Sequence, residues 1–175
     1  MKLKLTVLMA LFALTLSMIL NPSVFARGKQ NSSWWVSLTP SFVQSLRWVA
    51  KGADATDAVQ GGEEDGHPLY VCRASYASGI HPGKVVAGKC NIGYGGKEIV
   101  LAHYEILVGS GAWGEPRANY RGAFVAGTED GKSVYLCRTA FAGGVHPGKV
   151  VAGNCNIGYG GKEKVMPKYE VFYRG

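Results

Sequence analysis

The 175-residue sequence lacks most features of membrane, nucleic-acid-binding and metal-binding chains. Beyond residue 20, no apolar run approaches the roughly 20 residues of a membrane-spanning helix. No block of like charges and no recognised nucleic-acid-binding motif is present, so a nucleic-acid partner is not expected. No window after the first 20 residues has the long 3.6-residue apolar period of an amphipathic helix. The cysteine spacing resembles no C-x-x-C ligand pair, which argues against zinc.

The N-terminus has the pattern of a secretory signal peptide, residues 1–26. Lys2 and Lys4 precede an uncharged apolar run, and a small-residue cleavage pattern ends before Arg27. An uncleaved anchor is the alternative, but the run is short for a span, and no cysteine marks a lipoprotein. The leader holds two of the 19 basic residues and none of the 12 acidic ones, so the mature chain has a net charge of +5. We expect a secreted or periplasmic protein.

Glycine is abundant, and much of it lies in a segment that occurs twice. Residues 61–98 superpose on residues 126–163 without a gap, at an offset of 65. Within the last 18 residues of this segment, the only difference is Lys89 against Asn154. A fixed internal period indicates a repeat architecture. The chain therefore divides into an N-terminal extension (27–47), repeat one (48–110) and repeat two (113–175).

Each repeat is predicted to be a meander of short antiparallel strands. In repeat one, strands are expected near residues 58–60, 69–74, 84–87, 90–92 and 104–108. Glycine-containing turn signals separate them, including His81, Pro82 and Gly83. One 63-residue copy would bury little core alone. We expect an all-β fold in which the two repeats share one interior as a pseudo-twofold domain.

The N-terminal extension carries two adjacent tryptophans, Trp34 and Trp35. They are expected to dock onto the domain, although an exposed binding patch is the alternative. A short helix is predicted from Pro40 through Leu46, with proline at its first position.

The four cysteines form two pairs 18 residues apart, Cys72 with Cys90 and Cys137 with Cys155. In an exported protein such cysteines favour disulfides. All three possible pairings respect the repeat. We prefer the two local ones, each of which closes a hairpin, over free buried thiols.

Arg73 and Arg138 lie in the middle of predicted strands, where a charge is unusual. We expect ion pairs with Glu98 and Glu163. The sequence Gly-Gly-Lys-Glu at residues 95–98 lacks the spacing and the following Ser or Thr of a phosphate loop.

His81 and His146 each precede Pro-Gly-Lys. Catalysis or metal binding at these histidines is not favoured. A nucleophile and a histidine base need a third side chain that orients the base, and the sequence indicates none. We expect no enzyme activity, no cofactor and no metal.

The acidic turn at residues 63–65 and the nearby Lys84 indicate a different chemistry. Carboxylates accept hydrogen bonds from sugar hydroxyls, an ammonium group donates to them, and such charge-assisted bonds are strong. Tyr76 or Tyr94 could cover the apolar face of a sugar ring. Calcium binding by residues 63–65 is an alternative.

The sequence also resembles the DM-9 repeat family. The resemblance rests on Leu-Tyr-Val-Cys-Arg-Ala from residue 69, His-Pro-Gly-Lys from 81, Gly-Gly-Lys-Glu from 95 and Tyr-Glu-Ile-Leu from 104. It covers both repeats. The family's members typically carry tandem repeats in a pseudosymmetric all-β unit. Characterised members are mannose-binding lectins, and others accompany pore-forming natterin-like chains.

The resemblance implies a sugar site formed by Glu63 and Lys84. The family's acid at the first of these positions is commonly Asp, so Glu63 is a conservative departure. Repeat two keeps Lys149 but has Thr128 in place of the acid, and Glu129 could substitute only if the turn shifts. We expect one good site, in repeat one.

These features together predict a secreted lectin-like module that binds mannose-type glycans without catalysis. Because the affinity of a single sugar site is expected to be weak, a homodimer would strengthen binding through multivalency. The alternative is an envelope structural or adhesion protein that binds a protein partner.

Overall fold

The computed structural model describes residues 45–175. The predicted signal peptide and the tryptophan pair of the extension lie outside the described residues. So does the helix predicted from Pro40, except for its last two residues, which are not helical.

The described chain is built from fourteen short strands, seven in each repeat. Repeat one contains β1 (Arg47–Ala50), β2 (Gln60–Glu64), β3 (His67–Tyr76), β4 (Gly79–Val86), β5 (Lys89–Tyr94), β6 (Lys97–Leu101) and β7 (Glu105–Val108). Repeat two contains β8 (Gly111–Gly114), the 3-10 helix η1 (Ala118–Tyr120), β9 (Val125–Glu129), β10 (Lys132–Phe141), β11 (Gly144–Val151), β12 (Asn154–Tyr159), β13 (Lys162–Met166) and β14 (Glu170–Arg174). The all-β prediction is confirmed.

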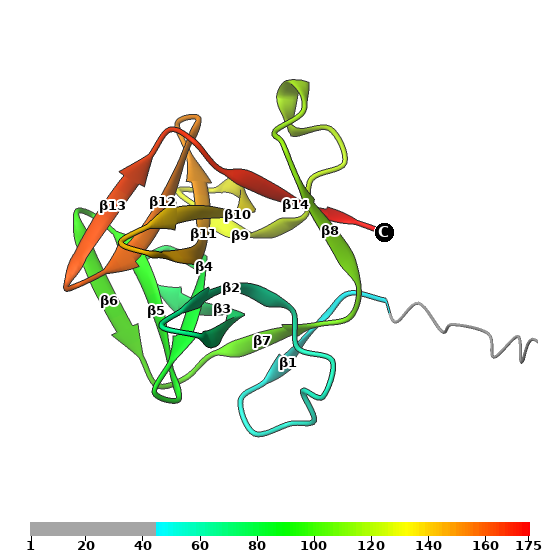
Figure 1. Cartoon of the computed structure of the whole chain (residues 1–175), viewed down its shortest axis with the longest axis vertical. Coiled ribbons are helices and arrows are strands. Elements are labelled where there is room, and N and C mark those ends of the chain that lie inside the picture. Colours follow the sequence, from blue (N-terminus) through cyan, green and yellow to red (C-terminus); the bar gives the residue numbers. More distant parts are fainter. Residues whose placement is uncertain (1–44) are drawn as a thin grey trace, which may run out of the picture. The chain divides into compact units, whose positions relative to one another are not determined.

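The order of the strands is symmetric about the junction of the two repeats. Along the sheet they follow β1-β7-β3-β2-β11-β12-β13 and then β6-β5-β4-β9-β10-β14-β8 (Figure 1), so that each strand of one half matches its repeat equivalent in the other. The extra pairings β3–β4 and β10–β11 close six strands, three from each repeat, into a ring. The duplication in the sequence is thus a pseudo-twofold in the structure.

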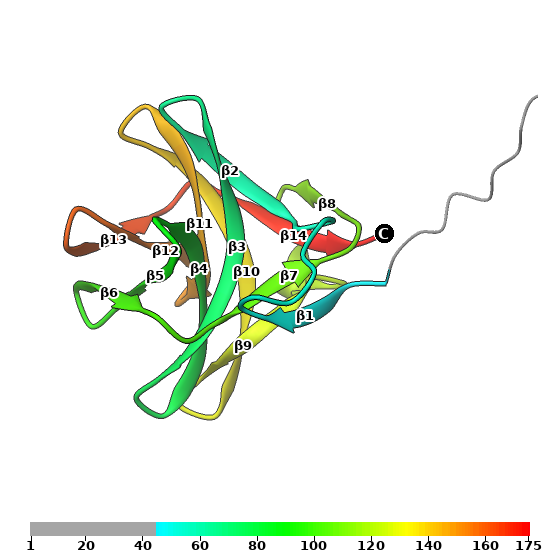
Figure 2. The same ribbon diagram turned by 90° about the horizontal axis from the view of Figure 1, so that it is seen from below.

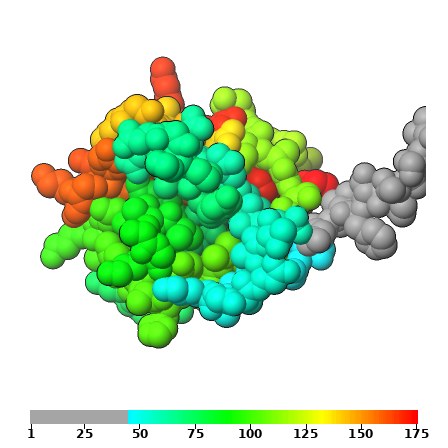
Figure 3. Space-filling model, turned by 60° about the horizontal axis from the view of Figure 1, so that its bottom comes forward, coloured from blue at the N-terminus to red at the C-terminus, as the bar shows by residue number. Residues whose placement is uncertain are grey.

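The two repeats meet at three strand pairs. β2 contacts β11 where Glu63 opposes Val145, β4 contacts β9, and β6 contacts β13. Figure 2 shows the result: the β2–β3 hairpin lies beside β10–β11, and β5–β6 lies beside β12–β13. In the space-filling view the gold and orange surface of repeat two lies directly against the green surface of repeat one (Figure 3). Any site at these junctions therefore draws residues from both repeats.

The main core is shared between the repeats, as predicted. It consists of apolar side chains at equivalent positions: Val59, Val71 and Leu107 from repeat one, and Phe124, Ala126, Leu136 and Phe172 from repeat two. Trp48 and Trp113 pack against it from symmetric positions. Two satellite clusters surround the disulfides Cys72–Cys90 and Cys137–Cys155, which are the pairings that we preferred.

The arginines within strands do form ion pairs, but not with the predicted partners. Arg73 Nε donates to Glu105 at 2.7 Å, and Arg138 Nε donates to Glu170 at 2.6 Å. Each pair joins residues directly opposite in register, because β3 pairs with β7 and β10 with β14. The prediction of Glu98 and Glu163 as partners is wrong.

The turn predicted at residues 81–83 is also wrong, because these residues lie inside strand β4. Proline cannot donate a ladder hydrogen bond and is tolerated in a strand only where none is required. On the side of β4 away from β3, β9 pairs at Ile80 and β5 pairs from Lys84 onward. Pro82 lies in the gap between these two partners. His81 and Lys84 are consequently held inside a sheet instead of in an exposed loop.

Among residues 45–175, no helix is long and apolar enough to cross a membrane.

Candidate functional site

Lys84 lies in a buried polar cluster at the junction of the repeats. Its side chain is only 3 % exposed. The ammonium nitrogen is 3.0 Å from Nδ1 of His146 and 3.8 Å from a carboxylate oxygen of Glu64. The same nitrogen lies 4.8 Å from the centre of the Tyr159 ring. The lysine and glutamate come from repeat one, whereas the histidine and tyrosine come from repeat two. We call this group the Lys84 cluster.

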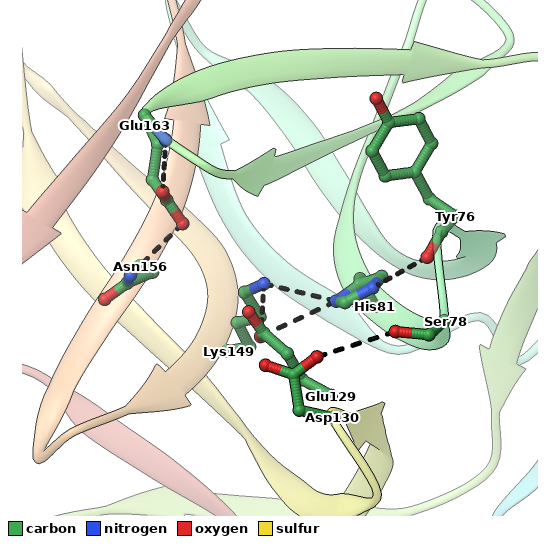
Figure 4. A network of polar contacts seen from close by, with 9 residues as sticks. Tyr76, Ser78, His81, Glu129, Asp130, Lys149, Asn156 and Glu163 are labelled. Atoms are coloured by element: carbon green, nitrogen blue, oxygen red, sulfur yellow. Dashed lines mark hydrogen bonds and ion pairs between the residues drawn. The ribbon is translucent and has the colours of Figure 1, made fainter.

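The equivalent Lys149 cluster contains the same residue types, supplied by the opposite repeats (Figure 4). Lys149 is 1 % exposed, and its ammonium nitrogen lies 2.5 Å from Glu129 and 3.2 Å from Nδ1 of His81. The Tyr94 ring lies 4.9 Å away. Here the lysine and glutamate belong to repeat two, and the histidine and tyrosine to repeat one. Each cluster is therefore a composite of both repeats.

The hydrogen bonds fix the state of both histidines. Nε2 of His81 lies 3.1 Å from the carbonyl of Tyr76, and Nε2 of His146 lies 3.0 Å from that of Phe141. Because a carbonyl only accepts, each Nε2 carries the proton and donates it. Each Nδ1 is then a bare acceptor for the lysine ammonium. Both imidazoles are neutral in this arrangement.

Burial dominates the electrostatics of the clusters. It lowers the pKa of His146, and the charge of Lys84 lowers it further, against the opposing effects of the Phe141 carbonyl and nearby carboxylates. Burial and Lys149 lower the pKa of His81 in the same way. Burial also lowers the pKa of Lys84. Burial raises the pKa of Tyr159, as do the charge of Glu64 and a hydrogen bond to its carboxylate.

The two clusters differ in how well the ammonium group is satisfied. Lys149 has both a carboxylate and an imidazole within hydrogen-bond distance. For Lys84 the carboxylate of Glu64 is too distant for a hydrogen bond, and His146 is its only hydrogen-bond partner among the described residues. A buried ammonium with unused N–H groups is costly unless another acceptor reaches it. Since an ammonium group has three N–H donors, the Lys84 cluster has more unused donor capacity than the Lys149 cluster.

A buried acceptor also lies next to each lysine. Asn91 pairs in register with Lys84, and directly opposite residues place their side chains on one face of a sheet. Nδ2 of Asn91 donates to Glu98, while Oδ1 is buried with no hydrogen-bond partner among residues 45–175. Asn156 repeats this arrangement beside Lys149. An unfilled acceptor therefore lies beside each lysine, and at Lys84 it accompanies the larger number of unused N–H groups.

Glu98 and Glu163 connect the repeats beside these asparagines. The second oxygen of Glu98 accepts from the main-chain N–H of Gly161, and that of Glu163 accepts from Gly96, each at 2.8 Å. The Gly-Gly-Lys-Glu segments thus hold the two repeats together, which is a structural role.

The structure does not bring Glu63 to Lys84. Neighbouring strand residues point to opposite faces, and in β2 it is Glu64 that faces the lysine while Glu63 is exposed. Glu63 instead lines a cavity of about 340 Å³ with Arg138, Val145 and Glu170. In repeat two, the predicted residues Glu129 and Lys149 do come together. Glu129 is the repeat equivalent of Glu64, so no shift of the turn is needed.

Sequence reasoning placed Tyr94 beside Lys84, whereas the structure places Tyr94 at Lys149 and Tyr159 at Lys84. It did not place the histidines or Tyr159 in the site. The His-Pro-Gly-Lys segment contains both the histidine and the lysine. One repeat alone does not reveal that each lysine contacts the histidine of the other repeat. Among the described residues, no group of three or more His, Cys, Asp or Glu side chains is placed to hold a metal ion. Glu63 and Glu64 point apart, which does not suit the calcium alternative.

Comparisons with known proteins support the resemblance to the DM-9 repeat family. The DM9 repeat profile matches residues 38–86 and 62–166, together well over half of the chain. Among solved structures, the nematode sperm cell motility protein MFP2B is similar, with a TM-score of 0.55 and 16 % identity over 74 % of this chain and 45 % of that one. This likeness concerns the fold alone, and the chain spans less than half the length of that protein. No curated protein matches the chain. On the repeat profile and the fold, the chain belongs to the DM9 repeat family.

Proposed function

We propose that the protein is a secreted, non-catalytic carbohydrate-binding module that recognises mannose-type glycans at the Lys84 cluster. The observation that carries this proposal is the ammonium group of Lys84, which has one hydrogen-bond partner and a carboxylate, Glu64, beside it. An ammonium donor next to a carboxylate acceptor matches a pair of adjacent sugar hydroxyls, each of which can accept and donate.

The exposure of the cluster suggests how a sugar would enter. The Glu64 side chain is 27 % exposed, whereas Lys84 lies beneath it. A sugar approaching from solvent meets Glu64 and the half-buried Tyr159 first. One hydroxyl donates to Glu64, and its neighbour accepts from Lys84. The mannose preference is taken from the resemblance to mannose-binding members of the family.

Secretion rests on two features. The leader has the pattern of a signal peptide, and both disulfides require an oxidising compartment to form and persist.

The test is a glycan array, followed by calorimetry with a mannotriose, on residues 27–175. Lys84→Met and Glu64→Gln should abolish the mannose signal, while Lys149→Met, the matched change in the other cluster, should retain it. Glu63→Gln tests the remaining acidic position and should bind as the unaltered protein does. Circular dichroism confirms that each variant is folded. A folded protein that binds no glycan, or a Lys84→Met variant that binds normally, overturns the proposal and favours an adhesion protein with a protein partner.

A further inference from the structure

The two clusters are linked reciprocally across the repeats. Lys84 of repeat one meets His146 of repeat two at 3.0 Å, and Lys149 of repeat two meets His81 of repeat one at 3.2 Å. Both histidines are fully buried. Neither lysine is positioned by a histidine of its own repeat. The geometry of each ammonium group therefore depends on the protonation state of a ring from the opposite repeat.

Because of the direction of these hydrogen bonds, protonation of a histidine removes its hydrogen bond to the lysine completely. Nε2–H of His146 is already committed to the carbonyl of Phe141, so the next proton can only enter at Nδ1. A proton there converts the acceptor into a donor that faces an ammonium group 3.0 Å away. Two positive donors at this distance in a buried site repel each other. The bond between Lys84 and His146 must then break.

A positive charge is less well compensated on His146 than on His81, because the two rings have different neighbours. His81 has the Glu129 carboxylate at 3.7 Å to offset a positive charge, with Asp130, Lys149 and Tyr94 also facing it.

His146 faces Lys84 of β4, Glu64 of β2, Glu98 of β6 and Tyr159 of β12. Among the described residues, no carboxylate oxygen lies within 4.0 Å of its ring nitrogens. A charge on His146 is therefore less well compensated than one on His81.

We propose that His146 is a positioning residue for Lys84 and that its protonation opens the Lys84 cluster, so that glycan bound at neutral pH is released in acid. This inference rests on the proposed function, because it requires Lys84 to hold the sugar. The pKa of His146 is lowered by burial and by Lys84, so release begins below the ordinary histidine value of 6.5. Below the pKa of His146 in the sugar-free protein, the affinity for the sugar falls by about tenfold per pH unit, because one proton competes with the sugar.

The experiment measures mannotriose affinity from pH 7.5 to pH 5.0 for the mature chain and for His146→Gln. A glutamine amide can donate to the Phe141 carbonyl and accept from Lys84, but it does not take up a proton in this range. The unaltered protein should lose affinity by about tenfold per pH unit below the pKa of His146, and His146→Gln should bind equally well throughout. His81→Gln and the exposed His67→Gln are matched controls that should keep the acid release. Acid release that persists in His146→Gln, or is lost in either control, overturns the inference.

A second measurement does not require sugar. Nitrogen NMR of the imidazoles should show His146 with a bare Nδ1 at pH 7.5 and a titration below pH 6.5. An Nδ1 that is protonated at neutral pH refutes the switch even if the protein binds glycan. Conversely, if no glycan binds but the NMR titration is as expected, the proposed function has failed and the acid-sensitive link between the repeats stands.

Discussion

The unequal ion pairs of the two clusters give a quantitative prediction. Glu129→Gln removes the carboxylate that lies 2.5 Å from the buried ammonium of Lys149 and leaves that charge uncompensated. Breaking a buried pair in this way should lower the free energy of unfolding by about 3 kcal/mol. Glu64→Gln removes a carboxylate 3.8 Å from Lys84, where no hydrogen bond to the ammonium group is lost. Its cost should be about 1 kcal/mol, as for a partly exposed pair.

A double-mutant cycle separates these pair energies from other effects of each change. Lys149→Met combined with Glu129→Gln removes both charges and should recover most of the stability lost in the single variant, since a neutral pair of similar volume is tolerated in a core. The same cycle is measured for Lys84→Met and Glu64→Gln. Urea unfolding with intact disulfides, followed by tryptophan fluorescence, provides the free energies.

The coupling energy should be about 3 kcal/mol for the Lys149 pair and about 1 kcal/mol for the Lys84 pair. Equal couplings, or a stronger coupling at Lys84, would refute the reasoning that one cluster is closed by its own ion pair and the other is open to a ligand.

Three further predictions concern the fold. Phe172→Ala opens a cavity in the shared core and should lower the free energy of unfolding by about 4 kcal/mol, measured by urea denaturation. Gly62→Ala places a methyl group on a main-chain carbonyl of the opposite repeat and should prevent native folding, whereas Gly114→Ala meets only ordinary van der Waals contacts and should fold normally by circular dichroism. His81 and His146 have lowered pKa values in the folded state, so the unfolded state takes up protons first as pH falls below 6.5. The urea midpoint should therefore be constant above that pH and decrease below it, and a double Gln variant should lose most of this decrease.

The repeat in the sequence was sufficient to predict two equivalent units that share one interior. An exact offset of 65 residues requires two equivalent units, and their small size requires a common interior. The equivalence of Val71 with Leu136 and of Leu107 with Phe172 in the core follows directly from that offset. The local disulfides were favoured for the same reason, since each cysteine pair closes a hairpin inside one repeat.

The site could be predicted only in part, because it depends on strand register. Glu63 and Glu64 are adjacent, and a shift of one residue exchanges the buried and exposed faces of a strand. Nothing in the composition of the turn decides which of them faces Lys84. The partners of Arg73 present the same problem, since Glu98 and Glu105 are both available and only the pairing of β3 with β7 selects Glu105.

The reciprocal exchange between repeats explains why a duplicated sequence can contain two different sites. Each lysine is enclosed by rings from the other repeat, so a substitution in one copy alters the cluster of the other as well as its own. Small departures from symmetry then suffice to make the two clusters different. At Lys149 the glutamate carboxylate forms a close ion pair with the ammonium group, at 2.5 Å, whereas at Lys84 the equivalent carboxylate is 3.8 Å away and leaves N–H groups unused. The Lys149 cluster joins the two repeats through its close ion pair, and the Lys84 cluster, whose ion pair is longer, is the one that we propose binds a ligand.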